Sequence, residues 1–314
     1  MPRAVVLGAG VSGLTTAVCL AERGCEVRVW TARSPRQTTS AAAGAMWGPS
    51  FAEPADRVPG WCEASLRAFQ ALAGDPASGV RMVPSLTVGG GSGDGPLPPV
   101  VRLIPDLRPC PPEETPPGYG GGFRSTMPLI DMGPYLDFLA ARLTTLGGTL
   151  EPRTVGSLAE AVEAAPVVVN CTGLRARELA GDRTVRPVRG QHVVFDNPGI
   201  TELFMELARP EWTSVFPHPT RVVCGGIAVP DSWDTAVDDA VTERIVDRCT
   251  RVVPALRDAR IIEVVVGLRP DRPSIRVAIE PIGAARVVHN YGHGGEGVSL
   301  SWGCARDAAE LALA

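Results

Sequence analysis

The chain of 314 residues contains no lysine, so arginine accounts for all 30 of its basic side chains. Without lysine the chain cannot form a P-loop, whose lysine contacts nucleotide phosphates. The GxSxG motif is also missing, which excludes the nucleophile elbow of α/β-hydrolases. No stretch reaches the roughly 18 consecutive apolar residues of a membrane span. The formal net charge of −4 gives no indication of a nucleic-acid partner.

Cysteine pairs with CxxC spacing are absent as well. The eight cysteines are scattered along the chain, at Cys19, Cys25, Cys62, Cys110, Cys171, Cys224, Cys249 and Cys304. Several lie within apolar runs, which favours reduced, buried thiols in a cytosolic protein. His289 and His293 have the spacing of a ligand pair, but a glycine between them disfavours a helix and no third ligand is evident. We therefore expect no metal site.

The N-terminal segment reads as a strand, a helix and a second strand. Residues 3–10 (RAVVLGAG) form a short apolar run, residues 11–24 have helical spacing that ends at Gly24, and residues 26–30 (EVRVW) form the next apolar run. A basic residue before an apolar run also resembles a secretory signal, but the glycines of this segment favour a folded turn. The βαβ order predicts a parallel sheet and the opening of a dinucleotide-binding fold.

Further elements are expected along the rest of the chain. Expected strands cover residues 165–173, 191–196, 221–227 and 260–268, and residues 286–297 form a strand that runs into a glycine loop. Expected helices cover residues 133–147, 238–256 and 297–313. Residues 86–122 are rich in proline and glycine and are predicted to be loops. Because nucleotide-binding elements occur at both ends and near residue 170, we expect two interleaved domains.

The glycines at the first turn follow the GxGxxG pattern. Gly8 permits the tight turn, Gly10 lets a pyrophosphate approach the backbone, and Gly13 allows the helix to pack closely on the strand. A glycine-rich turn without a ligand is the alternative. The acidic residue that usually binds the ribose is missing, because the second strand ends in the sequence TAR. This disfavours NAD, whereas Arg33 and backbone groups could hold an adenosine.

Six motifs occur in the order found in the D-amino-acid oxidase family of flavoproteins, of which D-aspartate oxidase is a close sibling. They are VVLGAGVSGL, TTSAAAGAMWGP, VVNCTGL, RPVRGQ, GLRPDRPSIR and HNYGHGGEGVSLSWG, and together they span nearly the whole chain. The chain resembles this family. The resemblance implies non-covalent FAD and oxidation of D-amino acids to imino acids, which hydrolyse to 2-oxo acids and ammonia. Oxygen then reoxidises the flavin and yields hydrogen peroxide.

The resemblance also implies an α/β fold in which two domains interleave. A Rossmann-like FAD-binding domain takes residues 1–50, 134–190 and 277–314, and an α+β substrate domain on a mixed or antiparallel sheet takes residues 51–133 and 191–276. The expected partners are a D-amino acid and oxygen, with neither nucleic acid nor a membrane, and a homodimer is left open. The C-terminus lacks an SKL-type signal, so we expect a bacterial-type cytoplasmic protein.

Cofactor contacts are assigned from the same motifs. The residues expected at FAD are Gly8, Gly10, Val11, Ser12, Gly13, Arg33, Thr38, Thr39, Ser40, Ala43, Gly44, Met46, Val155, Cys171, Thr172, Gly173, Gly294, Glu296, Gly297, Val298 and Ser299. Val155 is expected to meet the adenine through its backbone. The positive end of the final helix, near Val298 and Ser299, would stabilise the anionic reduced flavin.

Two groups are expected to hold the substrate. The resemblance assigns the carboxylate to Arg276, whose planar guanidinium can donate two charge-assisted hydrogen bonds. It assigns the amine to the backbone carbonyl of Gly295. Orientation of the Cα–H bond is then the main catalytic device.

Each arginine of the GLRPDRPSIR motif also has a structural alternative, an ion pair with a carboxylate such as Glu280 or Asp271. From the sequence, this alternative is favoured for Arg269 and Arg272 over Arg276.

One position departs from the family pattern. Phe216 stands where the family usually has a tyrosine whose hydroxyl bonds the carboxylate, and Trp212 stands about where mammalian members carry a lid tyrosine. Losing a hydroxyl partner of a charged group removes on the order of 1.5–3 kcal/mol. Met205 and Glu206 are assigned to the end of the substrate's side chain, although Glu206 could equally be a solvated surface charge.

Neutral D-amino acids are the expected substrates, because no second arginine is assigned to a side-chain carboxylate. Arg209 and Arg221 are the reservations. The alternatives are an amine oxidase acting on glycine, sarcosine, D-aspartate or a biosynthetic amino acid, a nicotinamide-dependent dehydrogenase, and a non-catalytic FAD-binding protein.

Overall fold

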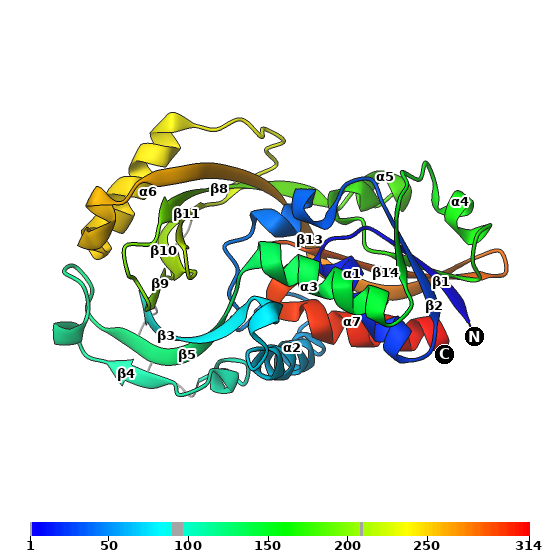
Figure 1. Cartoon of the computed structure of the whole chain (residues 1–314), viewed down its shortest axis with the longest axis horizontal. Helices are drawn as coiled ribbons and strands as arrows, with labels where there is room; N and C mark the ends of the chain where they lie inside the picture. Colours follow the sequence, from blue (N-terminus) through cyan, green and yellow to red (C-terminus); the bar gives the residue numbers. More distant parts are fainter. Residues whose placement is uncertain (1, 90–96, 208–209) are drawn as a thin grey trace.

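The computed structural model describes residues 2–89, 97–207 and 210–314. One mixed sheet runs through this part of the chain, with helices against both of its faces (Figure 1). Its strands follow the order β4-β5-β3-β9-β10-β11-β8-β13-β14-β7-β1-β2-β6, and β12 pairs with β8 beside this path. The predicted α/β fold is confirmed. The division into two domains stays a prediction, because strands of both predicted domains lie in this one sheet.

The helices are α1 (Val11–Glu22), α2 (Val58–Leu72), α3 (Met132–Thr145), α4 (Leu158–Val162), α5 (Ala176–Leu179), α6 (Asp239–Val252) and α7 (Gly297–Leu313). The strands are β1 (Arg3–Leu7), β2 (Glu26–Thr31), β3 (Val80–Val88), β4 (Arg108–Cys110), β5 (Gly122–Ile130), β6 (Thr149–Pro152), β7 (Val167–Asn170), β8 (Arg186–Asp196), β9 (Leu203–Glu206), β10 (Glu211–Pro217), β11 (Arg221–Ile227), β12 (Val229–Pro230), β13 (Ile261–Ile282) and β14 (Ala285–His293). None of the helices in the described ranges is both long and apolar enough to cross a bilayer.

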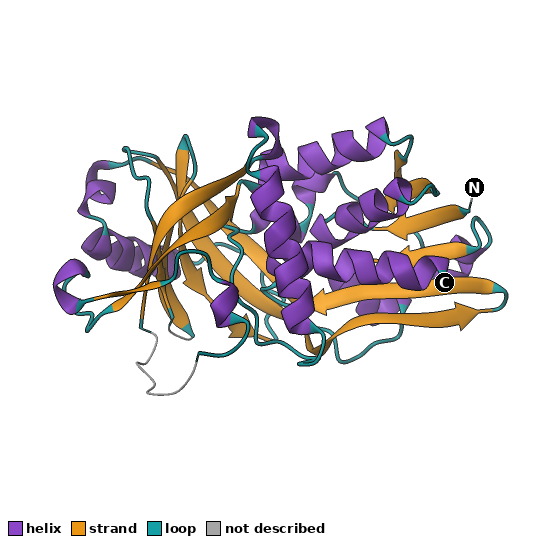
Figure 2. Cartoon of the chain, turned by 90° about the horizontal axis from the view of Figure 1, so that it is seen from below, coloured by secondary structure: helices purple, strands orange, loops and turns teal. Residues whose placement is uncertain are grey.

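The parallel region of the sheet has β1 at its centre, paired with β2 on one side and β7 on the other. Ala4 and Val6 pack into the core formed with α1, α2, α3 and α7. Val5 and Leu7 point the other way, into a smaller core formed with α4. Burial on both faces explains why β1 is a continuous apolar run. Figure 2 shows the helices gathered mainly over this half of the molecule.

Strand β13 is 22 residues long and joins the parallel region to the antiparallel region. Its first half pairs with β8, and its second half pairs with β14. The register with β14 shifts between Asp271 and Arg276, a segment that includes Pro273, which has no N–H to donate to a ladder. The GLRPDRPSIR motif therefore lies where the two regions of the sheet meet (Figure 1).

Several elements were not anticipated from the sequence, among them α2, β3, β5, β9 and β10. The predicted loop region 86–122 contains β4 and the ends of β3 and β5, and its residues 90–96 lie outside the described part of the chain.

All eight cysteines are described, and each is free and buried. Burial raises the pKa of the Cys19 and Cys171 thiols to about 12. The prediction of unpaired, buried thiols is confirmed.

Candidate functional site

The turn between β1 and α1 has no room for a side chain at Gly8. Gly8 has a φ of +103°, and an ideal Cβ there would lie 2.6 Å from the carbonyl oxygen of Cys171. An ideal Cβ at Gly13 would overlap the carbonyl oxygen of Gly8. The turn is thus pressed against the end of β7, at the carboxyl edge of the parallel strands, where open α/β sheets bind their ligands.

Thr38 and Ser40 lie against this turn, close to Gly10. The Ser40 hydroxyl oxygen accepts a hydrogen bond of 3.0 Å from the Val11 amide, and it lies 3.0 Å from an ideal Cβ at Gly10. Helix α1 begins after Gly10, an N-cap residue that has no side chain of its own to cap the helix. The amides of its first turn therefore point toward the cradle formed by the glycines, which suits a bound anion.

Helices α1 and α7 begin side by side. Thr15, the fifth residue of α1, donates a hydrogen bond of 3.4 Å to the carbonyl of Ser301, the fifth residue of α7. Helix α7 also begins without a capping side chain. Both positive helix ends therefore lie at the same edge of the sheet.

The turn after β7 closes this edge. The side-chain oxygen of Asn170 accepts hydrogen bonds from the backbone amide and the hydroxyl of Thr172, at 3.2 and 2.7 Å. Gly173 follows with a φ of +57° and faces Pro270 of β13. Cys171 and Thr172 therefore lie beside Gly8, and Gly173 lies beside β13.

The segment around Met46 is tied to the start of α7. The Gly48 amide donates to the hydroxyl of Ser299 at 3.1 Å, and the same hydroxyl donates to the Met46 carbonyl at 3.4 Å. The Ser50 hydroxyl hydrogen-bonds the carboxylate of Glu296. These contacts bring two predicted cofactor segments, distant in sequence, into one place.

Val155 and Arg33, the residues expected at the adenosine of the cofactor, lie in different environments. Val155 is buried, but its carbonyl oxygen already accepts a hydrogen bond of 3.2 Å from Arg175. Arg33 is exposed just beyond β2. The Val155 amide and Arg33 stay predicted contacts, and Arg175 is an additional cation that the sequence analysis did not single out.

The glycine loop after β14 lies along the GLRPDRPSIR segment of β13. Gly294 has a φ of +55°, and its amide donates to the carbonyl of Pro270 at 2.8 Å. An ideal Cβ at Gly295 would lie 3.4 Å from Cδ and 3.7 Å from Nε of Arg269. Arg269 is therefore the arginine of the motif that contacts Gly295.

The guanidinium of Arg269 is enclosed by glycine and tryptophan. It crosses Gly190 of β8 so closely that an ideal Cβ there would overlap both of its terminal nitrogens. It lies 5.7 Å from the ring centroid of Trp212, and one terminal nitrogen donates to the Ile227 carbonyl at 3.1 Å. Trp212 and Gly295, both expected at the substrate, therefore lie beside Arg269.

Arg276 lies in a different environment. Its guanidinium donates to the hydroxyl of Tyr291 at 2.7 Å and to the carboxylate of Glu280 at 2.6 Å. The hydrogen bond from Arg276 lowers the pKa of Glu280. Tyr291 in turn donates to Asp182 at 3.0 Å. This is the ion pair that the sequence analysis regarded as the alternative for this residue.

Arg272 also forms an ion pair, with Asp182 at 2.9 Å. Burial of Asp182 acts against its ionisation, yet hydrogen bonds from Thr184, Arg272 and Tyr291 hold its pKa at about 2. The ion pair expected for Arg272 is therefore present, and Arg276 has a carboxylate partner as well.

Phe216 is buried against the predicted flavin segment. An ideal Cβ at Gly44 would lie 2.7 Å from a ring carbon of Phe216, and Met46 and Met205 belong to the same apolar cluster. The carbonyl of Gly44 also lies 3.2 Å from Nε2 of the buried His218. Phe216 therefore presents an apolar surface to the segment around Gly44.

Glu206, which was assigned to the substrate's side chain, and Arg221, one of the two arginines named as reservations, each have a partner within the protein. Glu206 accepts a hydrogen bond of 2.9 Å from the Thr213 amide, and Arg221 forms an ion pair of 2.6 Å with Asp131. Arg209 lies outside the described residues. Arg221 is therefore already engaged by a carboxylate.

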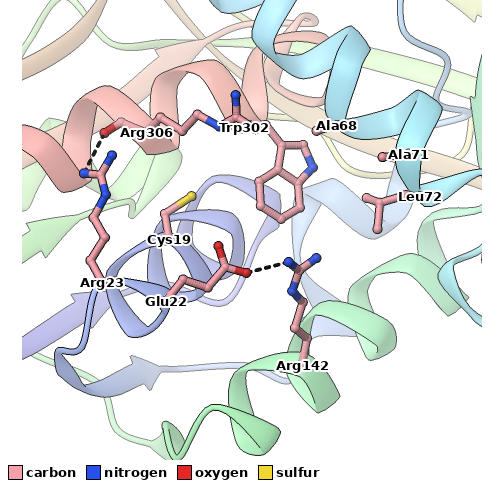
Figure 3. A pocket seen from close by; sticks show the side chains of 9 residues that line it. All are labelled: Cys19, Glu22, Arg23, Ala68, Ala71, Leu72, Arg142, Trp302 and Arg306. Carbon is pink, nitrogen blue, oxygen red and sulfur yellow. Dashed lines mark hydrogen bonds and ion pairs between the residues drawn. The ribbon is translucent and has the colours of Figure 1, made fainter.

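A separate pocket of about 290 Å³ lies between helices α1, α2, α3 and α7 (Figure 3). Its lining includes Arg23, Arg142 and Trp302. Arg23 directly follows α1, and Arg142 lies in the last turn of α3. At these positions a cation offsets the partial negative charge of the helix C-terminus. The pocket lies at the opposite end of α1 from the glycine turn, about 18 Å away at 1.5 Å per residue, so it is not the cofactor site.

Comparisons with known proteins agree with this geometry. The sequence model of the family described as FAD dependent oxidoreductase matches residues 3–311. A protein of Rubrobacter xylanophilus called D-amino-acid oxidase is 46% identical over 312 residues, covering 99% of this chain and 95% of that protein. A Streptomyces coelicolor protein of the same name is 45% identical over 313 residues, covering 98% and 96%. The crystal structure of glycine oxidase from Geobacillus kaustophilus superposes with a TM-score of 0.81, covering 100% and 95%, but its 17% identity shows the fold alone.

Proposed function

Because the chain belongs to the family of FAD-dependent oxidoreductases, we propose that it oxidises neutral D-amino acids to 2-oxo acids, with release of ammonia and hydrogen peroxide. The names of the two bacterial relatives support the reaction. The observation that carries the proposal in this chain is the contact between Arg269 and Gly295. An amino acid bears its carboxylate and its amine on one carbon, so the groups that bind them must be neighbours.

The residues present fit FAD. The cradle at Gly8 and Gly13 lets a pyrophosphate approach the backbone, and the uncapped starts of α1 and α7 offer amides to anionic groups. Residues 44–46, tied to the start of α7 through Ser299, provide a surface for the ring. We propose that the cofactor binds here without a covalent link. When bound, FAD supplies an acceptor for two electrons and the Cα hydrogen. Oxygen later takes the two electrons from the cofactor.

Arg269 binds the substrate carboxylate in this proposal. Its guanidinium is planar and lies beside an indole ring, an arrangement that suits two parallel charge-assisted hydrogen bonds to a carboxylate. The carbonyl of Gly295 accepts a hydrogen bond from the neutral amine. Two anchors on one carbon fix the direction of the Cα–H bond, which is the main catalytic contribution of the protein.

The atoms balance with water and oxygen as co-reactants. The amino acid loses its Cα hydrogen together with the two electrons of the C–H bond, and it loses one proton from nitrogen. It thereby becomes an imino acid. Water hydrolyses the imino acid to the 2-oxo acid and ammonia. Oxygen gains the two electrons and two protons and leaves as hydrogen peroxide.

Arg276 has a structural role in the same proposal. It joins Tyr291 of β14 to Glu280 of β13, and Glu280 lies 3.1 Å from Nε2 of the buried His289. Removing Arg276 would leave the Glu280 carboxylate and the Tyr291 hydroxyl with one partner fewer. The expected consequence is a loss of stability rather than of substrate affinity.

Neutral side chains are preferred because Arg221 is held by Asp131. Moving it to a substrate carboxylate would leave Asp131, which is mostly buried, without this partner. The apolar cluster of Phe216, Met46 and Met205 also favours an uncharged substrate.

A peroxide-release screen tests the function. Purified protein is supplied with FAD and with both enantiomers of the common amino acids, glycine and sarcosine. The proposal requires peroxide from neutral D-amino acids and none from their L-enantiomers. A higher kcat/KM for glycine, sarcosine or D-aspartate than for every neutral D-amino acid would replace it with one of the alternative substrates.

A further inference from the structure

His192 is a polar residue of the proposed site to which the mechanism gives no role. It lies in β8, opposite Gly225 of β11 and Val265 of β13. Its Cβ is 2.9 Å from an ideal Cβ at Gly225, so the side chain lies on the face of the sheet that this glycine leaves open. This placement raises the question of what the imidazole contacts.

The register puts His192 on the same face as Arg269. Side chains two residues apart on a strand share a face and stand about 6.6 Å apart. Gly190 is two residues before His192, and the guanidinium of Arg269 lies across Gly190. The imidazole is therefore the next side chain along β8 from the proposed carboxylate site.

The other neighbours on this face are apolar. Val194 follows on β8, Val223 lies on β11 and Val265 lies on β13, and all three belong to the cluster that contains Phe216. Among the hydrogen bonds formed within the described residues, none involves the His192 side chain. Burying a polar group among aliphatic side chains lowers the stability of the fold unless the group forms a hydrogen bond.

We propose that His192 is a specificity residue that hydrogen-bonds the side chain of the substrate, and that it favours D-amino acids with a hydroxyl or amide group over aliphatic ones of the same shape. This inference rests on the proposed function, since it places the substrate carboxylate at Arg269. A side chain that extends from the anchored Cα along β8 reaches the imidazole next, and its polar group would satisfy the ring.

The imidazole is neutral at physiological pH. Burial, followed by the positive charges of Arg269 and Arg221, lowers the pKa of His192 to about 4. A neutral ring offers one donor and one acceptor, which suits an amide or a hydroxyl. It offers no compensating positive charge to D-aspartate or D-glutamate, in agreement with the proposed preference for neutral side chains.

Two pairs of substrates with nearly equal shape test the proposal. D-asparagine is matched with D-leucine, and D-threonine with D-valine, so each ratio of kcat/KM reports the polar group alone. In His192→Leu we expect both polar-to-aliphatic ratios to fall by roughly 5- to 30-fold, the effect of losing one hydrogen bond and adding an apolar wall. The kcat/KM for D-alanine, whose methyl group makes no hydrogen bond, should change by less than about threefold.

Val193 provides a matched control. It is adjacent to His192 on β8 but points to the opposite face, where it is fully buried in the core formed with α6. Val193→Ala should lower the melting temperature and leave both ratios unchanged. If His192→Leu does not fold, His192→Ala serves for the same comparison.

Unchanged ratios in a variant that still oxidises D-alanine would overturn the role of His192 while the proposed function stands. Absence of D-amino-acid oxidation in the wild type would instead overturn the proposed function.

Discussion

The guanidinium of Arg269 lies across a glycine that no other residue can replace without moving it. At Gly190 the space of a Cβ atom is taken by the terminal nitrogens of Arg269. Its Cζ lies near the Trp212 ring, and its Cδ and Nε lie near Gly295. Glycine at position 190 therefore leaves the space that the guanidinium occupies. The position of the Arg269 guanidinium thus depends on Gly190, a neighbour that has no side chain.

Gly190→Ala should disturb substrate binding and leave cofactor binding intact. The added methyl group displaces the guanidinium and weakens its hydrogen bonds to the carboxylate, at a cost of about 1.5–3 kcal/mol, or roughly 10- to 100-fold in kcat/KM for D-alanine. Steady-state kinetics and the flavin absorbance per protein measure the two effects. Gly156→Ala is the control, because no atom lies within 4 Å of an ideal Cβ there. Equal kinetics for Gly190→Ala and the wild type would show that Arg269 does not bind the substrate from this position.

At the scale of elements, the paired starts of α1 and α7 form the cofactor site. Close packing of α1 on β1 depends on Gly13, where a methyl group would overlap the Gly8 carbonyl. The hydrogen bond from Thr15 to the Ser301 carbonyl then ties the two helices together one turn into each. Displacement of α1 would therefore change the position of both helix ends.

Gly13→Ala should lose FAD. Overpacking at a backbone contact costs about 1–3 kcal/mol, and the shift of α1 away from β1 should weaken FAD binding by roughly tenfold or more. Flavin fluorescence titration of the apoprotein measures the affinity, and thermal unfolding measures the stability. Gly60→Ala in α2, which has no atom within 4 Å of an ideal Cβ, should keep FAD affinity unchanged. Wild-type FAD affinity in Gly13→Ala would contradict the role assigned to the turn.

The elements recognisable from the sequence are those with a strong local pattern. The βαβ start, α3, α6 and α7 each show an apolar period or a glycine stop, and each lies close to its predicted range. Strands β3, β5 and β9 depend on pairing between distant segments, which no local pattern reveals. The same limit applies to Arg276, because no local pattern reveals that Arg269 is the arginine that contacts Gly295.

At the scale of the whole molecule, the four histidines share one electrostatic property. They are His192, His218, His289 and His293, and burial lowers the pKa of each to about 4, with additional charges contributing at the first three. The unfolded chain holds each imidazole near its ordinary pKa of about 6.5. Between these values the unfolded state binds more protons than the folded state, so stability decreases as the pH falls.

The molecule should therefore be labile to acid. The contribution of the neutral imidazoles to the free energy of unfolding is fully present above about pH 6.5 and is lost as the pH falls toward 4. Each fully buried imidazole accounts for up to about 1.4 kcal/mol per unit of its pKa shift. Thermal unfolding between pH 4 and 8 should show a melting temperature that falls steadily below pH 6.5. His293→Gln, which removes a buried imidazole, should flatten this dependence. A melting temperature that is constant over the range would contradict the burial of neutral histidines.

The most direct test of the account compares two arginines of one strand. Arg269→Ala and Arg276→Ala are each assayed for kcat/KM with D-alanine, for FAD content and for melting temperature. Loss of the carboxylate anchor costs on the order of 3–5 kcal/mol, so Arg269→Ala should lose about a hundred- to several-thousand-fold in kcat/KM and keep its flavin. Arg276→Ala should melt at a lower temperature and lose less than about tenfold. A large loss of kcat/KM in Arg276→Ala, with near-normal kinetics in Arg269→Ala, would contradict the account.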